Sequence, residues 1–181
     1  MELVDVYNER YENTGKSKER GKTKETEYRK ACFVWIINSE NKILVQQRSK
    51  TRKHYPNLWA ATSGGVLSGE TSIQSMLREL KEELGLNIKE KELTFIGTYK
   101  RVNDFVDTYL LEKDIDVNDV TIQPEEVQNV KWMSIYHFEK LIARGEASDT
   151  SFGLFKNYYD NYYKRTVEFI DGKPVLRKIK E

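Results

Sequence analysis

The sequence contains a single cysteine, Cys32, so it lacks the pair that an internal disulfide requires. A chain without disulfides is typical of the reducing cytoplasm, where we expect this protein to act. The sequence also lacks an apolar run approaching the roughly 20 residues of a membrane helix. Residues 1–16 have no apolar stretch of the kind found in a signal peptide. We therefore expect a cytoplasmic protein with no membrane partner.

An excess of charge of either sign is missing as well. The 181 residues include 30 basic and 29 acidic ones, which leaves a formal net charge of +1. Nucleic-acid-binding surfaces are strongly basic, so this balance argues against a nucleic acid as partner. The chain has 38% hydrophobic and 33% charged residues, which is typical of a soluble, highly charged globular domain. Its length suits one domain with a small extension.

Short apolar runs between polar turns predict the strands. We expect a hairpin from residues 31–38 and 43–47, a second strand pair from 93–101 and 105–113, and a strand over 127–133. Strands interleaved with few helices predict a mixed α/β fold.

The two ends of the chain differ from its centre. Residues 1–30 are expected to form an N-terminal edge strand, at residues 3–7, followed by a polar arm, and residues 31–181 the main domain. Within that domain, helices are expected over residues 135–144 and 151–165, and a hairpin-like tail over 169–179. The second helix is rich in tyrosines that either pack it or form a contact between two copies of the chain; they are Tyr158, Tyr159, Tyr162 and Tyr163.

The clearest helix in the sequence spans Thr71 to Leu84. Thr71 and Gln74 have the spacing of a capping box, and Gly85 is a typical C-terminal stop. The helix has one apolar face, made by residues at helical spacing: Ile73, Met76, Leu77, Leu80 and Leu84.

Beside this apolar face, Glu79, Glu82 and Glu83 share one stripe of the helix. Carboxylates three and four residues apart repel one another by roughly 0.2–0.5 kcal/mol per exposed pair. Mg²⁺ offsets such repulsion, because it is held by oxygen ligands, usually a few carboxylates together with substrate phosphates. Arg78 is the other group placed to pair with Glu82 or Glu70. The alternative is an ordinary solvated helix face.

The loop before the helix favours the metal site. Residues 62–70 read TSGGVLSGE, and the glycines allow a tight backbone path and close approach of a ligand. Loop and helix together read G64-x5-E70-x7-R78-E79-L80-x-E82-E83-x-G85-L86. This segment matches every fixed position of the Nudix box, so the chain resembles the Nudix family from about Ala31 to Leu141.

This resemblance implies an α/β/α sandwich around a mixed sheet and the hydrolysis of a nucleoside diphosphate linked to another group X. It implies that Glu79, Glu82 and Glu83 bind divalent metal, Mg²⁺ or alternatively Mn²⁺, and that one of them orients or deprotonates the attacking water. The carbonyl of Gly64, or that of Gly65, would add a ligand. The loop would be braced by Glu70, Arg78 and Gly85.

Other site residues are expected outside the box. A catalytic base on a later loop would be Glu125 or, as we predict, Glu126. The alternative is that both glutamates only belong to a solvated turn before the strand. A basic cluster follows the first hairpin, and from it Arg48 and Lys53 are predicted to bind substrate phosphate or the X group. Tyr109 is predicted to stack on substrate, with structural packing as the alternative.

The wider chain resembles the branch of this family that includes isopentenyl-diphosphate isomerase, through VDVYNERYENTGK, KACFVWIINSENKILVQQRS and NLWAATSGG. The isomerase requires a cysteine before the box glycine and a histidine after it, where this chain has Ser63 and Gly65. Arg29 and Tyr109 likewise stand at positions where the isomerase uses a histidine and a glutamate. We therefore favour a hydrolase. An isomerase-like enzyme and a non-catalytic nucleotide sensor are the alternatives.

Overall fold

The computed structural model describes residues 2–163, 165–170 and 173–178, and it describes side chains for residues 2–161. Its centre is a mixed seven-stranded sheet of order β5-β4-β3-β8-β7, in which β6 pairs with β3 and β9 with β4. β3 and β8 run parallel, and the other pairs are antiparallel. The strands are β3 (Arg29–Ile37), β4 (Lys42–Arg48), β5 (Trp59–Ala60), β6 (Thr62–Gly65), β7 (Leu93–Lys100), β8 (Asp104–Glu112) and β9 (Val127–Ser134).

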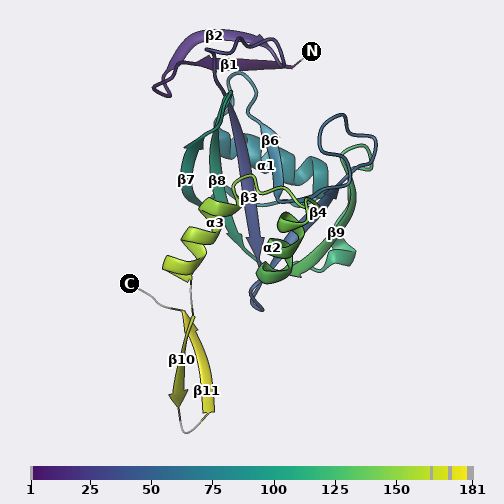
Figure 1. Cartoon of the computed structure of the whole chain (residues 1–181), viewed down its shortest axis with the longest axis vertical. Coiled ribbons are helices and arrows are strands. Elements are labelled where there is room, and N and C mark those ends of the chain that lie inside the picture. Colours follow the sequence, from purple (N-terminus) through teal and green to yellow (C-terminus); the bar gives the residue numbers. More distant parts are fainter. Residues whose placement is uncertain (1, 164, 171–172, 179–181) are drawn as a thin grey trace.

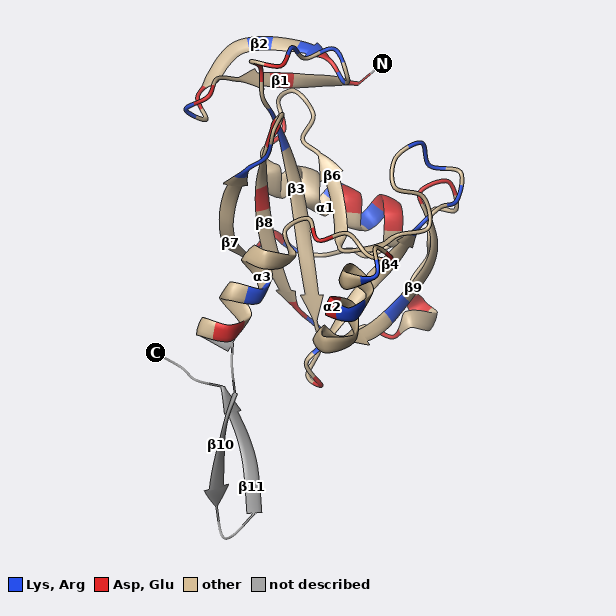
Figure 2. Cartoon of the chain, in the orientation of Figure 1, with Lys and Arg blue, Asp and Glu red and all other residues tan. Residues whose placement is uncertain are grey.

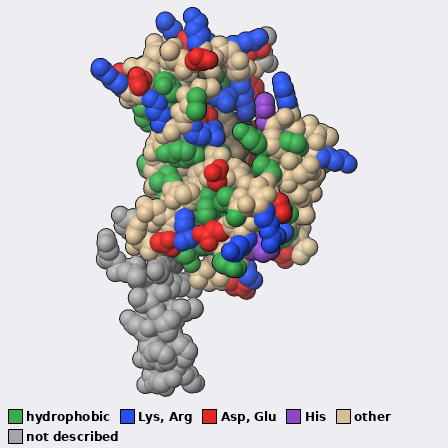
Figure 3. Space-filling view, viewed as in Figure 1, with side chains coloured by type: hydrophobic (Ala, Val, Ile, Leu, Met, Phe, Trp, Pro, Cys, Tyr) green, Lys and Arg blue, Asp and Glu red, His purple; other side chains and the backbone are tan. Residues whose placement is uncertain are grey.

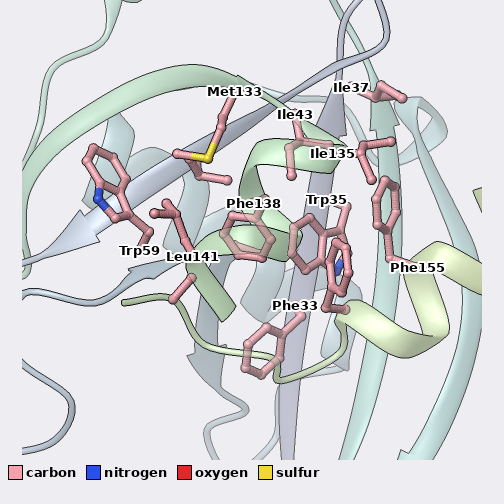
Figure 4. Close-up of a cluster of buried hydrophobic side chains, with 14 of the residues drawn as sticks. Phe33, Trp35, Ile37, Ile43, Trp59, Met133, Ile135, Phe138, Leu141 and Phe155 are labelled. Atoms are coloured by element: carbon pink, nitrogen blue, oxygen red, sulfur yellow. The ribbon is translucent and has the colours of Figure 1, made fainter. Parts of the chain in front are cut away.

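Strand β3 divides the core in two because its side chains alternate between the faces of the sheet. Phe33, Trp35 and Ile37 face one cluster, covered by α2 (Ile135–Ala143) and α3 (Phe152–Tyr158) (Figures 1 and 4). Val34 and Ile36 face the other cluster, covered by α1 (Ser72–Leu84). A strand buried on both faces has a continuous apolar sequence. The expected α/β/α sandwich is confirmed.

Helix α1 has the ends that its sequence indicates. Thr71 is the N-cap, both hydrogen bonds of the capping box are present, and Gly85 ends the helix in the left-handed conformation at φ 70°. Met76, Leu80 and Leu84 are fully buried. The C-terminal half of the helix, which carries the glutamates, is therefore packed against the sheet.

The expected hairpin of residues 31–38 and 43–47 forms over only part of its length. β3 and β4 pair at Ile36–Leu44 and Ile37–Ile43. Farther along β3, strand β6 takes the neighbouring position and pairs Cys32 with Gly64. The glycine loop is thereby fixed directly to the central strand.

The polar arm expected over residues 9–30 contains a strand that we did not predict. β2 (Asn13–Glu19) pairs with β1 (Leu3–Tyr7) to form an N-terminal hairpin, which lies over the beginning of β3 (Figure 1). β2 has no apolar alternation, because most of its side chains are exposed. Figure 2 shows the lysines, arginines and acidic residues along this hairpin.

The C-terminal helix is shorter than expected over 151–165. α3 ends at Tyr158 and is followed by a π-helical turn, Tyr159–Tyr163. The expected tail hairpin consists of β10 (Arg165–Ile170) and β11 (Lys173–Lys178), whereas its turn, 171–172, lies outside the described residues. Short 3-10 turns, Glu90–Glu92 and Val117–Asp119, complete the described elements. No helix in this described part is long and apolar enough to span a membrane.

Candidate active site

A cleft of about 480 Å³ opens beside the glycine loop and the last turns of α1. It collects residues from the N-terminal hairpin, from β3, β6 and α1, and from the loops before β5 and β9. Its charged lining residues are Glu2, Arg20, Arg29, Arg48, Arg52, Arg78, Glu79, Glu82, Glu83, Arg101, Asp104 and Glu126. Figure 3 shows the basic side chains that gather on the hairpin end of one face.

Glu83 is the most buried of the three box glutamates, with 5% of its surface exposed. Its Oε2 accepts a hydrogen bond of 2.6 Å from Gln46 Nε2, and Gln46 Oε1 in turn accepts one of 3.1 Å from the Thr62 hydroxyl. Burial, with smaller contributions from the charges of Glu79 and Glu126, raises the pKa of Glu83 to about 8. Within residues 2–161, no lysine, arginine or histidine forms an ion pair with this carboxylate.

Glu79 occupies the space that the missing side chain of Gly64 leaves open. A Cβ at Gly64 would lie 2.2 Å from Glu79 Cδ and Oε1. Burial raises the pKa of Glu79, although the neighbouring guanidinium of Arg78 opposes this effect. The glycine at the start of the box is therefore required by the position of this carboxylate.

Arg78 connects the loop to the helix. Its guanidinium donates to Glu70 over 2.9 and 3.1 Å, to Glu79 over 2.9 Å and to Glu82 over 3.1 Å. It also donates to the carbonyl oxygen of Gly65 over 3.3 Å. The hydrogen bond from Arg78 lowers the pKa of Glu70. These contacts link Glu70 and Arg78, the two residues expected to brace the loop, to each other and to Gly65.

The chemistry of this end of the cleft suits a hard divalent cation. It offers carboxylate oxygens, one of which lies against Gly64 and another of which is buried against a neutral amide. As they stand, the carboxylates are drawn apart, since Arg78 holds Glu79 and Glu82 while Gln46 holds Glu83. Within the described residues, no group of three acidic, histidine or cysteine side chains is close enough to hold a metal.

The remaining expected residues divide into two groups. Arg48 and Glu126 line the cleft, where Glu126 is ion-paired with Arg52. Lys53 does not line it: the side chain is exposed in the loop after β4, where Arg52 and Tyr55 face the cleft instead. Tyr109 is 5% exposed in the core under α1, and its hydroxyl lies 2.7 Å from that of Ser72. The structure therefore does not bring Lys53 or Tyr109 to the site.

Sequence reasoning missed several lining residues because they are far apart along the chain. Arg20 follows β2, Arg29 begins β3, and Arg101 lies in the turn between β7 and β8. Gln46 was missed because a glutamine within a strand gives no chemical signal until its partner is known. The alternation of β3 was the one available clue, since it places Arg29 on the same face as Ala31 and Phe33, which also line the cleft.

Comparison with known proteins agrees with this geometry. The family model described as NUDIX domain matches residues 27–152. A Nudix hydrolase of Listeria innocua is 36% identical over 81% of this chain and 88% of its own length. The chloroplastic isopentenyl-diphosphate Delta-isomerase I of Arabidopsis thaliana is 28% identical over 78% of this chain and 56% of its own length.

Solved structures with a similar fold include further proteins. A crystal structure from Deinococcus radiodurans superposes with a TM-score of 0.72 at 24% identity, covering 87% of this chain and 99% of that one. The structure of an NMN adenylyltransferase/ADP ribose pyrophosphatase from Francisella tularensis, complexed with AMP and a manganese ion, gives 0.57 at 18% identity over 72% of this chain and 41% of that one. Together with the matched family model, these findings place the chain in the Nudix family, as a Nudix hydrolase.

Proposed function

We propose that this chain is a Mg²⁺-dependent hydrolase that cleaves a diphosphate linkage in a nucleoside diphosphate derivative. The observation that carries the proposal is the environment of Glu83. A carboxylate buried in a cleft beside two other glutamates, with a neutral glutamine as its hydrogen-bond donor, is costly unless a cation shares the site. A divalent ion accounts for this arrangement.

In this proposal Glu79, Glu82 and Glu83 hold the metal, with the Gly64 carbonyl as a further ligand. When bound, Mg²⁺ supplies polarisation of the phosphoryl oxygens and a lowered pKa of a bound water. Mn²⁺ is the alternative ion, as in the Francisella tularensis complex. Gln46 orients Glu83 through its hydrogen bond, and Arg78 positions Glu79 and the glycine loop.

The basic side of the site binds the substrate phosphates. Arg48 is half-buried in the cleft and its Nε donates to the carbonyl of His54, so most of its guanidinium donors are available to phosphate oxygens. Glu126 remains our proposed base for the attacking water. It acts in that role only after its ion pair with Arg52 opens, for example when Arg52 turns toward a phosphate.

The test is a panel of nucleoside diphosphate derivatives incubated with Mg²⁺, with release of phosphate or nucleoside monophosphate as the readout. Glu83→Gln removes a carboxylate that is proposed to bind the metal and is expected to lower kcat by at least about a hundredfold. Glu90→Gln, at an exposed glutamate outside the cleft, is the matched control and retains the rate. A Glu83→Gln enzyme that hydrolyses substrate at the wild-type rate contradicts the proposed mechanism.

The likeness to an isopentenyl-diphosphate isomerase makes proton-transfer isomerisation a second candidate. Ser63 lines the cleft at the position where that enzyme requires cysteine, whereas Cys32 is buried beneath Gly64. Conversion of isopentenyl to dimethylallyl diphosphate would establish the isomerase. Tight binding of a nucleotide without turnover under any metal would instead establish a sensor.

The cytoplasmic location and a dimer remain predictions. Tyr158 and Tyr159 pack partly buried against the core cluster around Trp35, which favours the packing role over the dimer contact for these two. Side chains of Tyr162 and Tyr163 lie outside the described residues. Sedimentation analysis of the full chain tests the dimer directly.

A further inference from the structure

One part of the cleft, around the start of β3, is basic. Three guanidinium groups line it, from three separate elements: Arg20 from the N-terminal hairpin, Arg29 from β3 and Arg101 from the β7–β8 turn. Two carboxylates lie among them, Glu2 and Asp104. This arginine triad therefore leaves one positive charge uncompensated. Near α1 the balance is reversed, because there the carboxylates outnumber the arginines.

The pairing within the triad shows which arginine carries the excess charge. Arg101 donates two hydrogen bonds to Asp104, over 2.6 and 2.5 Å, and Arg20 pairs with Glu2 over 2.7 Å. Arg29 reaches Asp104 only at 3.9 Å, which is beyond hydrogen-bonding distance. Among the side-chain hydrogen bonds of residues 2–161, none is donated by the Arg29 guanidinium.

The surroundings of Arg29 disfavour its positive charge. Its side chain is 31% exposed, and burial, together with the like charges of Arg20 and Arg101, lowers its pKa. A guanidinium that is partly desolvated, faces two others and lacks a hydrogen-bonded acceptor is stabilised most by an anion with several oxygens. Phosphate and carboxylate groups meet this requirement.

The triad is continuous with the proposed reaction site. The Arg20 guanidinium carbon lies 3.4 Å from the point where a Cβ of Gly65 would stand, next to the glycine that accommodates Glu79. From there the floor of the cleft runs along one face of β3, through Ala31 to Arg29. Successive residues on one face of a strand are separated by roughly 6–7 Å. An anion at Arg29 therefore lies beyond the diphosphate bound at the glutamates, but in the same cleft.

We propose that Arg20, Arg29 and Arg101 form a second anion site, and that the substrate is a diphosphate that carries a further phosphate or carboxylate away from the bond that breaks. This proposal rests on the proposed diphosphate hydrolase. It narrows the substrate class: the nucleoside or the X group is itself anionic. Arg29 binds that anion, while Asp104 and Glu2 hold Arg101 and Arg20 in place beside it.

Matched pairs of probes test the second anion site. NADPH and NADH, coenzyme A and 3′-dephospho-coenzyme A, and UDP-glucuronate and UDP-glucose each differ by one anionic group. Binding of all six to the full chain is measured by calorimetry with Ca²⁺ in place of Mg²⁺, and ligand integrity is checked afterwards. In at least one pair, the more anionic member is expected to bind about tenfold more tightly. The pair that responds identifies whether the anion sits on the nucleoside or on X.

Four variants assign this preference to residues. Arg29→Gln is expected to abolish it and Arg29→Lys to retain part of it, because lysine keeps the charge. Arg48→Gln is expected to weaken the binding of both members of a pair equally, since Arg48 is proposed to bind the diphosphate that they share. Arg144→Gln, at an exposed arginine that ends α2, is the matched control and leaves the preference unchanged.

The proposal is overturned if no pair shows a preference, or if the preference survives in Arg29→Gln. Turnover of the same probes with Mg²⁺ separates this failure from that of the proposed function. Equal hydrolysis of both members of every pair supports the hydrolase and removes the second anion site. A preference in binding that depends on Arg29, without hydrolysis of any probe, supports the second anion site and contradicts the proposed hydrolase.

Discussion

Glu79 lies where the side chain of any other residue at position 64 would stand. The glycine is required by the carboxylate next to it and not by its own backbone angles, since a Cβ would meet Glu79 at 2.2 Å. The atoms that this Cβ would meet belong to the carboxyl end of the Glu79 side chain. A larger residue at position 64 would therefore displace the carboxylate from the cleft and leave the backbone unchanged. Function is therefore more sensitive to this position than stability is.

Gly64→Ala is expected to lower kcat by about a hundredfold or more while the protein stays folded, because displacement of a site group by about 1 Å costs that much. Steady-state kinetics and circular dichroism provide the two readouts. Gly153→Ala is the matched control, since its Cβ would enter open space in α3. An active Gly64→Ala enzyme would show that Glu79 does not act from its present position.

Cys32 shows how burial removes reactivity from the single cysteine. The thiol is fully buried, and burial, aided by the charge of Glu79, raises its pKa to about 12. Because the thiolate is the reactive form, we expect no labelling by a chromogenic disulfide reagent at pH 8 in the native protein. One thiol per chain should react in denaturant. Rapid labelling without denaturant would mean that β3 opens in the native state.

At the scale of elements, the N-terminal hairpin is attached to the glycine loop. Asp5 accepts hydrogen bonds from the hydroxyls of Ser17 and Ser68 and, over 3.4 Å, from the amide of Gly69. The Ser68 amide also donates to the carbonyl of Leu3. These contacts hold the loop and, through the hairpin, place Arg20 over the cleft.

The attachment through Asp5 is expected to weaken in acid. Burial alone would raise the pKa of Asp5, but the hydrogen bonds from Ser68, Gly69 and Ser17 lower it overall. A carboxyl with a lowered pKa in the folded state contributes stability above its unfolded value of about 3.9, and this is lost as pH falls through the folded pKa.

Protection of the amides of residues 2–20 and 66–70, measured as the exchange rate relative to the intrinsic rate at the same pH, is therefore expected to fall below about pH 4. Asp5→Asn should show the faster exchange already at pH 7. Glu25→Gln, at an exposed glutamate in the turn before β3, is the control and should exchange as the wild type does. Unchanged exchange in Asp5→Asn would mean that the hairpin is held by other contacts.

At the scale of the whole molecule, the aromatic cluster on the α2–α3 face joins the C-terminal helices to the sheet. Trp35 stacks on Phe155 with ring centroids 4.7 Å apart and meets Phe138 edge-on at 5.4 Å (Figure 4). The Trp35 Nε1 donates to the Ser151 hydroxyl over 2.9 Å. Helix α3 is thereby fixed beside the strand that carries Arg29 and Phe33 into the cleft.

Phe155→Ala is expected to lower the free energy of unfolding by about 3–5 kcal/mol, the usual cost of removing a fully buried phenyl ring. Urea denaturation measures this loss. Phe95→Ala, at a phenylalanine that is 55% exposed on β7, should change stability by no more than about 1 kcal/mol. Equal effects of the two substitutions would contradict the packing described for α3.

The sequence alone determined the strands with continuous apolar runs, the capped helix α1 and the chemistry of the box. These features are local: periodicity, caps and the spacing of Gly64, Glu70, Arg78 and the glutamates are all read within one segment. The tertiary structure decided what depends on distance in space. Residues 13–19 became a strand only through pairing with β1, and Tyr109 lies in the core while Lys53 lies outside the cleft. The partners of the site carboxylates, Gln46 for Glu83 and Arg52 for Glu126, were likewise decided by the tertiary structure. Folding also brings Arg20, Arg29 and Arg101 together in one cleft. Their charges can act jointly on an anion only there, because electrostatic interactions strengthen as charges approach and water between them is removed.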